Sequence, residues 1–291
     1  MEEDDEVIAL IKKYLPAWLK RSIRNTIWGF RQRTWRYRAL PDFIIIGAQK
    51  AGTTSLFAYL EQHPQILPSY KKELEYFDGG KYSVDLFAKG EGWYRAHFPL
   101  KTFMGHDKKT FEASPSYIFN PNAPKRIFDR IPDVKMILLL RNPTERAISQ
   151  YFHMKRLHAE ELPLMEALME EENRLAPILK NKDYNTRKFD FWTYKMRGKY
   201  EEQIQRYLKY FPREQILIID SDELYQKPKE TLEQIYAFVG VDNKYIIKDL
   251  KPRNVSTNRN RVDPKVFEYL NDFFHPYNQK LYDLIGKKYD W

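Results

Sequence analysis

The sequence of 291 residues contains no cysteine. Disulfide bonds, thiolate metal sites and a cysteine nucleophile are therefore excluded, and the composition fits a reducing compartment. The sequence also lacks any apolar run near the roughly 20 residues of a membrane-spanning helix. Its longest apolar runs, at 43–46 and 136–140, have the length of strands. No secretory signal is visible at the N-terminus, where Met1 is followed by five acidic residues. We therefore expect a cytoplasmic protein.

Acidic residues are fewer than basic residues. The chain has 49 Lys and Arg against 40 Asp and Glu, which gives a net charge of +9. Such an excess favours anionic partners, which include nucleotides, sulfated or carboxylated glycans, membranes and nucleic acid. The hydrophobic content of 43% suffices for one large α/β domain or, as the alternative, for two small domains.

Residues 7–41 contain no Asp or Glu, but nine Lys or Arg and half of the tryptophans. Apolar residues recur there at helical spacing, interrupted by Pro16: Leu10, Ile11, Tyr14, Leu15, Trp18 and Leu19. Two interpretations stay open. The segment is an arm that contacts a membrane surface or a polyanion, or it is a helix packed on the domain with a solvated basic face. We assign residues 1–40 to a basic amphipathic arm and 41–291 to one domain.

From residue 41 onward, short apolar runs alternate with helical patterns. The predicted strands are 42–46, 110–113, 135–140 and 215–220, and the predicted helices are 54–62, 121–130, 144–157, 200–210 and 228–240. This alternation predicts a single α/β domain with a central parallel sheet flanked by helices. Ligands bind such sheets at the carboxyl ends of the strands. Gly47 and Arg141 each follow the end of a predicted strand.

A glycine loop runs from Gly47 to Ser55 between the first predicted strand and helix. The spacing of Gly47 and Gly52 matches the G-x-x-x-x-G of a P-loop, in which a lysine should come next. Thr53 takes that position instead, and Lys50 lies inside the loop. Such a loop binds phosphate through backbone N–H groups and a helix N-terminus. It lacks the lysine for the β- and γ-phosphates of ATP. We therefore predict a nucleotide with a single phosphate at this point and a different transferable group.

A second phosphate site is predicted after the run 136–140. Asn142 is a favourable helix N-cap, and Glu145 can close the cap. Arg141 thus lies between a strand end and a helix start, where its guanidinium can bind a phosphate. Ser149, two turns into the helix, could add a hydroxyl. The alternative is that Arg141 and Arg146 pair with carboxylates such as Glu145.

Together the two motifs, about 90 residues apart, resemble those of the sulfotransferases that use PAPS, 3′-phosphoadenosine 5′-phosphosulfate. The resemblance implies that Arg141 and Ser149 bind the 3′-phosphate, and that the product is PAP. It accounts for the displaced lysine, because that family uses no γ-phosphate and needs no metal. It further implies that the 5′-phosphosulfate lies in the first loop, against Gly47, Gln49, Lys50, Ala51, Gly52, Thr53, Thr54 and Ser55.

The resemblance is closest to the heparan sulfate branch and its bacterial relatives, and it covers roughly residues 41–291. Three stretches carry this resemblance: 72–78, 112–117 and the tail from 274 to 291. Ala113 stands where that branch commonly has a lysine, and Glu75 where a histidine is common. The animal members also have a disulfide and a Golgi anchor. These departures favour a soluble bacterial-type enzyme with a different hydroxyl acceptor.

The resemblance implies that Glu73 is the general base and that Lys50 stabilises the leaving oxygen. If 73–77 is extended, Glu75 points to the same face as Glu73 and plays a supporting role. Two neighbouring carboxylates would raise the pKa of one of them. The alternative is that both are surface charges neutralised by Lys71 and Lys72.

Four further residues are candidates. Arg259 and Arg261 fall where the family closes a basic loop over the 3′-phosphate, so we expect them to bind the cofactor. Arg197 contacts the acceptor or nucleotide, or merely opens a surface helix. His63 ends a predicted helix, and we expect it to be a C-terminal cap.

Our leading hypothesis is a sulfotransferase that moves a sulfuryl group from PAPS to a hydroxyl or amine acceptor, such as a glycan or small alcohol. We expect no metal and no nucleic-acid partner. One alternative is a kinase with an atypical P-loop. The other is a catalytically idle scaffold that binds an anionic glycan or a membrane through residues 7–41.

Overall fold

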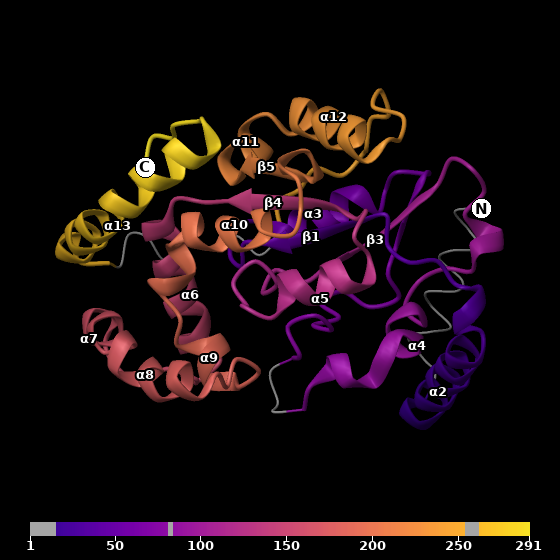
Figure 1. Ribbon diagram of the computed structural model, residues 1–291, viewed down its shortest axis with the longest axis horizontal. Coiled ribbons are helices and arrows are strands. Elements are labelled where there is room, and N and C mark those ends of the chain that lie inside the picture. The colour runs from indigo at the N-terminus through magenta and orange to yellow at the C-terminus, as the bar shows by residue number, and fades with distance from the viewer. Residues whose placement is uncertain (1–15, 81–83, 254–261) are drawn as a thin grey trace.

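The computed structural model describes residues 16–80, 84–253 and 262–291. Five strands form one parallel sheet in the order β2-β3-β1-β4-β5. They are β1 (Phe43–Gly47), β2 (Ile66–Pro68), β3 (Lys109–Ala113), β4 (Lys135–Leu140) and β5 (Ile216–Asp220). Figure 1 shows the strands at the centre of the molecule with helices around them. The predicted α/β domain with a central parallel sheet is confirmed.

Two of the three inner strands, β1 and β4, are apolar along nearly their whole length. Every residue of β1 is buried, and in β4 only Lys135 is partly exposed. Strands covered on both faces need such continuous apolar runs, because neither face meets water. Phe43 of β1 pairs in register with Phe111 of β3, and their rings stack with centroids 5.0 Å apart. All four predicted strands are present. The edge strand β2, with only three residues, was missed because it is too short to show a pattern.

All five predicted helices are present, with ends that differ by a few residues. The helices are α2 (Ala17–Arg33), α3 (Thr53–Leu60), α4 (Gly90–Arg95), α5 (Ala123–Arg130), α6 (Pro143–Arg156), α7 (Leu164–Met169), α8 (Glu171–Asn181), α9 (Arg187–Phe191), α10 (Tyr200–Leu208), α11 (Ser221–Gln226), α12 (Pro228–Val239) and α13 (Pro264–Ile285). The longest, α13, was not predicted. It continues through Pro276, although proline usually ends a helix. It buries Val266, Leu270 and Phe274 at helical spacing, so packing stabilises it.

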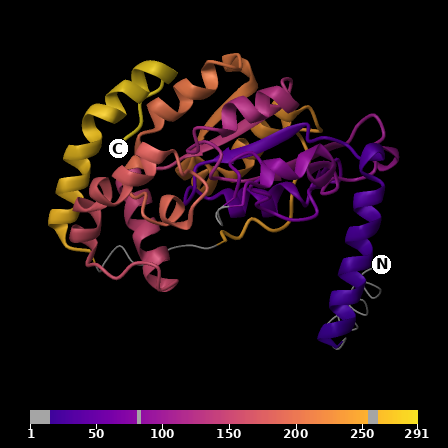
Figure 2. The same cartoon turned by 60° about the horizontal axis from the view of Figure 1, so that its bottom comes forward.

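The first and last described helices, α2 and α13, differ in how far they lie against the domain. Helix α13 lies along the outside of the domain and packs against α10 (Figure 1). Helix α2 begins directly after Pro16, and Figure 2 shows it projecting away from the body. The earlier part of the predicted arm lies outside the described residues. Among the helices described, none is both long and apolar enough to cross a bilayer.

Candidate active site

The loop between β1 and α3 depends on two glycines. A Cβ atom on Gly47 would lie 2.4 Å from Cγ2 of Ile118, and one on Gly52 would lie 2.6 Å from the hydroxyl of Tyr225. Gly52 also has a φ of +93° as the N-cap of α3, in the left-handed region that favours glycine. The glycines therefore permit a close backbone path that brings the N-terminus of α3 to the carboxyl end of β1.

The segment after β4 is built as predicted. Oδ1 of Asn142 accepts hydrogen bonds from the backbone N–H groups of Thr144 (2.9 Å) and Glu145 (3.2 Å), so Asn142 caps α6. The guanidinium group of Arg141 makes two contacts with described residues. Its Nη2 lies 3.7 Å from Oε2 of Glu145, which is the predicted alternative ion pair. Its Nη1 donates a hydrogen bond of 3.1 Å to the backbone oxygen of Lys50. The two motifs are thus in direct contact.

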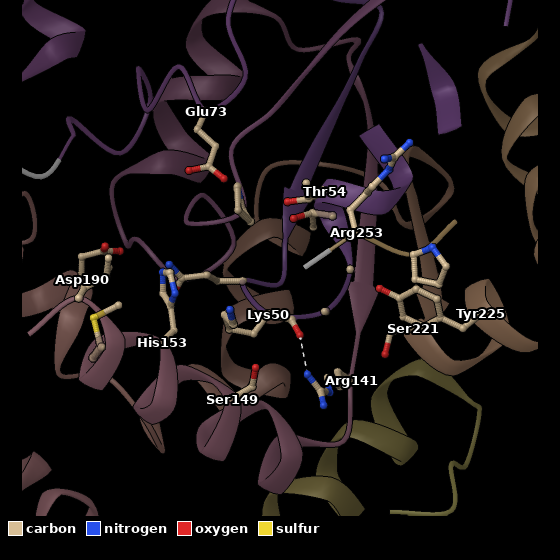
Figure 3. A pocket seen from close by; sticks show the side chains of 18 of the residues that line it. Lys50, Thr54, Glu73, Arg141, Ser149, His153, Asp190, Ser221, Tyr225 and Arg253 are labelled. Carbon is tan, nitrogen blue, oxygen red and sulfur yellow. Dashed lines mark hydrogen bonds between the residues drawn. The ribbon is translucent and has the colours of Figure 1, made fainter. Parts of the chain in front are cut away.

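Both motifs open into one cavity of about 690 Å³, within the size range of ligand sites in proteins. In Figure 3, Lys50, Ser149 and Arg141 lie between two groups of side chains. Glu73, His153 and Asp190 form one group, and Ser221, Tyr225 and Arg253 form the other. The cavity is lined by Gln49, Lys50, Ala51, Gly52, Thr53, Thr54, Glu73, Pro115, Arg141, Ser149, His153, Met154, Leu157, Asp190, Phe191, Ser221, Asp222, Tyr225, Pro252 and Arg253.

Most of the predicted site residues therefore lie around the same cavity. Gly47, Ser55 and Glu75 are not among the described lining residues. The fully buried hydroxyl of Ser55 instead accepts a 2.8 Å hydrogen bond from the backbone N–H of Arg253. Arg259 and Arg261 lie outside the described residues. The roles assigned to all of these residues stay predictions.

Positive charge is concentrated around Lys50. Burial, followed by the guanidinium groups of Arg156, Arg141 and Arg146, lowers the pKa of Lys50 to about 8, against a smaller opposing effect of Glu73. A lowered lysine pKa means that the surroundings disfavour its positive charge. An anion placed beside Lys50 would relieve this repulsion. The electrostatics of the cavity therefore suit a negatively charged ligand.

The segment that carries Glu73 is not the extended strand that we considered. Glu73 and Glu75 have φ values of +58° and +52°, in the left-handed region, and no strand is assigned there. Burial nevertheless alternates along the segment, because Leu74 and Tyr76 are buried while Glu73 and Glu75 are partly exposed. Nζ of Lys72 lies 2.7 Å from Oε1 of Glu73. Glu73 therefore both pairs with a lysine, as the alternative predicted, and lines the cavity.

A buried carboxylate lies beneath this segment. Glu112 on β3 is fully buried and accepts hydrogen bonds from the hydroxyls of Tyr94 (2.7 Å), Ser114 (2.9 Å) and Tyr117 (3.1 Å). Burial raises the pKa of Glu112 to about 7, although the three hydroxyls act in the opposite direction. Such a group is costly to bury, and it is tolerated because its oxygens have donors.

The same hydroxyls hold the backbone next to Glu73. Oγ of Ser114 accepts a 3.1 Å hydrogen bond from the N–H of Glu75, and the hydroxyl of Tyr117 accepts one of 3.0 Å from the N–H of Tyr76. Each hydroxyl donates to Glu112 and so presents its lone pairs to these N–H groups. Glu112 thereby positions the left-handed segment that places Glu73 at the cavity.

Sequence reasoning missed about half of the lining residues. His153 lies one turn after Ser149 on α6, and Ser221 directly follows the carboxyl end of β5, so helical spacing and the strand-end rule could have found them. Asp190, on the five-residue α9, gave no such signal. Its Oδ1 accepts a 2.7 Å hydrogen bond from Nη2 of the buried Arg197. Arg197 is therefore held in the interior and is not among the described lining residues.

His63 is a structural residue. Its ring is buried, with Nδ1 accepting a 3.1 Å hydrogen bond from the N–H of Gln65 and Nε2 lying 3.0 Å from the backbone oxygen of Asp242. These contacts join the end of α3 to the segment after α12. The C-cap residue of α3 is Glu61, so His63 is not the cap that we expected.

The protein has an α/β fold with a glycine loop, an arginine next to a capped helix start and a positively charged cavity at the carboxyl ends of parallel strands. These features are typical of nucleotide-binding proteins. Comparison with known families defines it further. The sulfotransferase domain family matches residues 40–271. The chain belongs to this family, and the predicted family is confirmed. It is therefore a sulfuryl-transferring type of enzyme.

Individual relatives agree. The chain is 29% identical to membrane-associated sulfotransferase kil1 of Dictyostelium discoideum, covering 87% of this chain and 66% of that protein. It is 30% identical to mouse (Mus musculus) heparan sulfate glucosamine 3-O-sulfotransferase 5, covering 87% and 74%. The crystal structure of a sulfotransferase from Alicyclobacillus acidocaldarius matches with a TM-score of 0.66 and 31% identity, covering 86% and 98%. The chain thus spans about two thirds to three quarters of the length of these two curated relatives.

The positioning role of Glu112 can be tested by Glu112→Gln. An amide cannot accept hydrogen bonds at both ends, so the support of Ser114 or Tyr117 is lost. We expect backbone amides of residues 73–77 to exchange with deuterium about fivefold faster, the equivalent of one net hydrogen bond of about 1 kcal/mol. Tyr94→Phe is the control, because it removes one donor to Glu112 but keeps the ring that stacks on Tyr76 and leaves the hydroxyls of Ser114 and Tyr117 in place. Unchanged exchange at 73–77 in Glu112→Gln would contradict the role.

Proposed function

We propose that the protein transfers a sulfuryl group from PAPS to a hydroxyl or amine acceptor, by in-line displacement with Glu73 as general base. One observation carries the proposal. The loop holding Lys50 and the turn holding Arg141 contact each other through the hydrogen bond from Nη1 of Arg141, and both line one cavity with Glu73. Two anion sites and a carboxylate in one cavity match a donor with two phosphate groups next to an acceptor.

The chain's own donors suit this nucleotide. Lys50, Thr53 and Thr54, with the N-terminus of α3, would bind the 5′-phosphosulfate. Arg141 and Ser149 would bind the 3′-phosphate. The transferring group must lie near Glu73, so the nucleoside would extend toward the opposite group, Ser221, Tyr225 and Arg253 (Figure 3). Arg259 and Arg261 stay predicted ligands of the 3′-phosphate.

The chemistry requires a proton acceptor and a means of stabilising the leaving group. Glu73 would take the proton from the acceptor hydroxyl or amine. Lys50 would neutralise charge that develops on the leaving phosphate oxygen, helped by the positive end of the α3 dipole. PAPS supplies the activated sulfuryl group when bound. A supporting role of Glu75 stays a prediction, and its side chain is not among the described residues that line the cavity.

For the acceptor, a glycan hydroxyl is the first choice to test, because one relative is a heparan sulfate glucosamine 3-O-sulfotransferase. A small alcohol is the second choice. We also propose a cytoplasmic protein whose segment 7–41 contacts a membrane or a polyanion. Preferential binding of ATP would favour the kinase alternative, and no transfer from PAPS to any acceptor would favour the scaffold alternative.

Removing the base should separate chemistry from binding. Glu73→Gln keeps the size of the side chain but cannot accept a proton at neutral pH. We expect transfer of radiolabelled sulfate from PAPS to N-sulfated heparosan or to a phenol to fall about 10²-fold or more. Titration calorimetry should show nearly unchanged PAP affinity. The matched control is Glu75→Gln, which should lose far less turnover. An equally large loss of PAP affinity in Glu73→Gln would make Glu73 structural.

Arg141→Ala should discriminate between two nucleotides. PAP has a 3′-phosphate and adenosine 5′-phosphosulfate does not, so PAP affinity should fall more than tenfold while the affinity of the second ligand changes little. Arg156→Ala, at the end of the helix that follows Arg141, controls for the loss of one positive charge. Equal weakening of both ligands would remove the assignment. Preferential Mg²⁺-dependent binding of ATP by the unmodified protein would instead support the kinase.

The affinity for PAP should depend on pH through Lys50. In the free protein the pKa of Lys50 is lowered to about 8 by burial and neighbouring arginines. Bound phosphate would raise this pKa, so binding takes up a proton above pH 8. The dissociation constant should therefore rise with pH above 8, by at most about tenfold per pH unit. Lys50→Arg stays charged and should lack this dependence. The same slope in both proteins would assign the effect to another group.

A further inference from the structure

Helix α2 carries an exposed apolar stripe. Leu19, Ile23, Ile27 and Phe30 recur at intervals of four, four and three residues, which places them along one side of a helix. Ile23, Ile27 and Phe30 are 43%, 42% and 55% exposed. Apolar side chains gathered in this way on a surface usually mark a binding site.

Basic side chains lie on both sides of this stripe. The helix contains five Lys or Arg and no acidic residue. With about 100° per residue, Arg24 lies about 60° around the axis from Ile27, and Arg33 lies about 60° from Phe30 on the other side. Both arginines are exposed. The helix therefore presents an apolar strip with positive charge along each side.

The domain holds α2 by a different side. The ring of Trp28 stacks on Tyr70 with centroids 6.4 Å apart and lies 4.6 Å from the ring of His97. Arg31 donates hydrogen bonds from Nε to the backbone oxygen of Ala96 (2.7 Å) and from Nη2 to that of Phe98 (2.9 Å). These contacts fix the last turns of α2 to the segment around α4.

The attachment leaves Ile23 and Phe30 facing away from the domain, while Ile27 lies nearer to the attached side, about 40° around the axis from Arg31. Ile23 and Phe30 lie about 140° and 160° around the helix axis from Trp28. Figure 2 shows the first turns of α2 projecting beyond the body of the domain. The predicted packing of a helix on the domain is thus correct for the last turns. It accounts neither for the projecting turns nor for the exposed stripe.

We propose that α2 lies flat on an anionic lipid bilayer, with Ile23, Ile27 and Phe30 inserted at the boundary between headgroups and acyl chains. Arg24 and Arg33 would contact lipid phosphates and carboxylates. A bilayer surface satisfies both features, because it offers apolar depth and negative charge side by side. A sulfated glycan would attract the arginines and leave the apolar strip in water. This proposal does not depend on the catalytic assignment.

Vesicle flotation of the full chain tests the proposal. The probes are vesicles of phosphatidylcholine alone and vesicles with about one third phosphatidylserine. We expect binding to the anionic vesicles only. Ile23→Ser with Phe30→Ser should weaken this binding more than tenfold, and so should Arg24→Gln with Arg33→Gln. PAP affinity should be unchanged in both variants, which shows that the domain is folded.

Matched controls come from an exposed loop elsewhere. Ile246 is 69% exposed, and Lys244 and Lys248 are exposed beside it. Ile246→Ser and the pair Lys244→Gln with Lys248→Gln should bind vesicles as the unmodified protein does. Loss of binding in these controls would overturn the assignment to α2.

Two other outcomes would also overturn it. In the first, the protein does not bind vesicles, and its binding to immobilised heparin is weakened by Arg24→Gln with Arg33→Gln but not by Ile23→Ser with Phe30→Ser. The surface would then be a polyanion site. If light scattering shows a dimer that dissociates in the Ile23→Ser and Phe30→Ser variant, with no vesicle binding, the occupant is a second copy of this chain.

Discussion

The hydrogen bond from Arg141 to the backbone oxygen of Lys50 joins the two halves of the site. It forms because β1 and β4 are neighbours in a parallel sheet, so the loops that follow them emerge at the same edge. Two motifs about 90 residues apart in the chain thereby enclose one cavity. Burial, followed by the nearby guanidinium groups of Arg156 and Arg141, lowers the pKa of Lys50. An anionic ligand would compensate for this repulsion.

A second constraint is the set of buried contacts that hold the backbone around Glu73. Glu73 lies on a segment without regular secondary structure, in a backbone region that non-glycine residues rarely adopt. Such a conformation persists only where surrounding contacts hold it. Here the contacts come from Ser114 and Tyr117, which in turn depend on the buried Glu112. Glu112, which is not among the described residues that line the cavity, thus helps to place Glu73, which does line it.

The predictions that held were those based on local patterns. The apolar run 136–140 is buried in β4, and Asn142 caps α6, because both depend only on neighbouring residues. The extended form of 73–77 was wrong, because contacts from β3 override local preference. Helix α13 was missed since Pro276 is tolerated where packing stabilises the flanking turns. Asp190 was missed because only the fold brings the short α9 to the cavity.

By itself, the sequence determined the alternating α/β architecture, the glycine loop with its displaced lysine, and the absence of any thiol chemistry. These follow from residue type and spacing, which act over a few residues. The tertiary structure alone decided that Lys50 and Arg141 touch, that Ser55 bonds to Arg253 rather than lining the cavity, and which side of α2 meets water. Such facts depend on contacts between distant segments, and no local pattern encodes the distance between them.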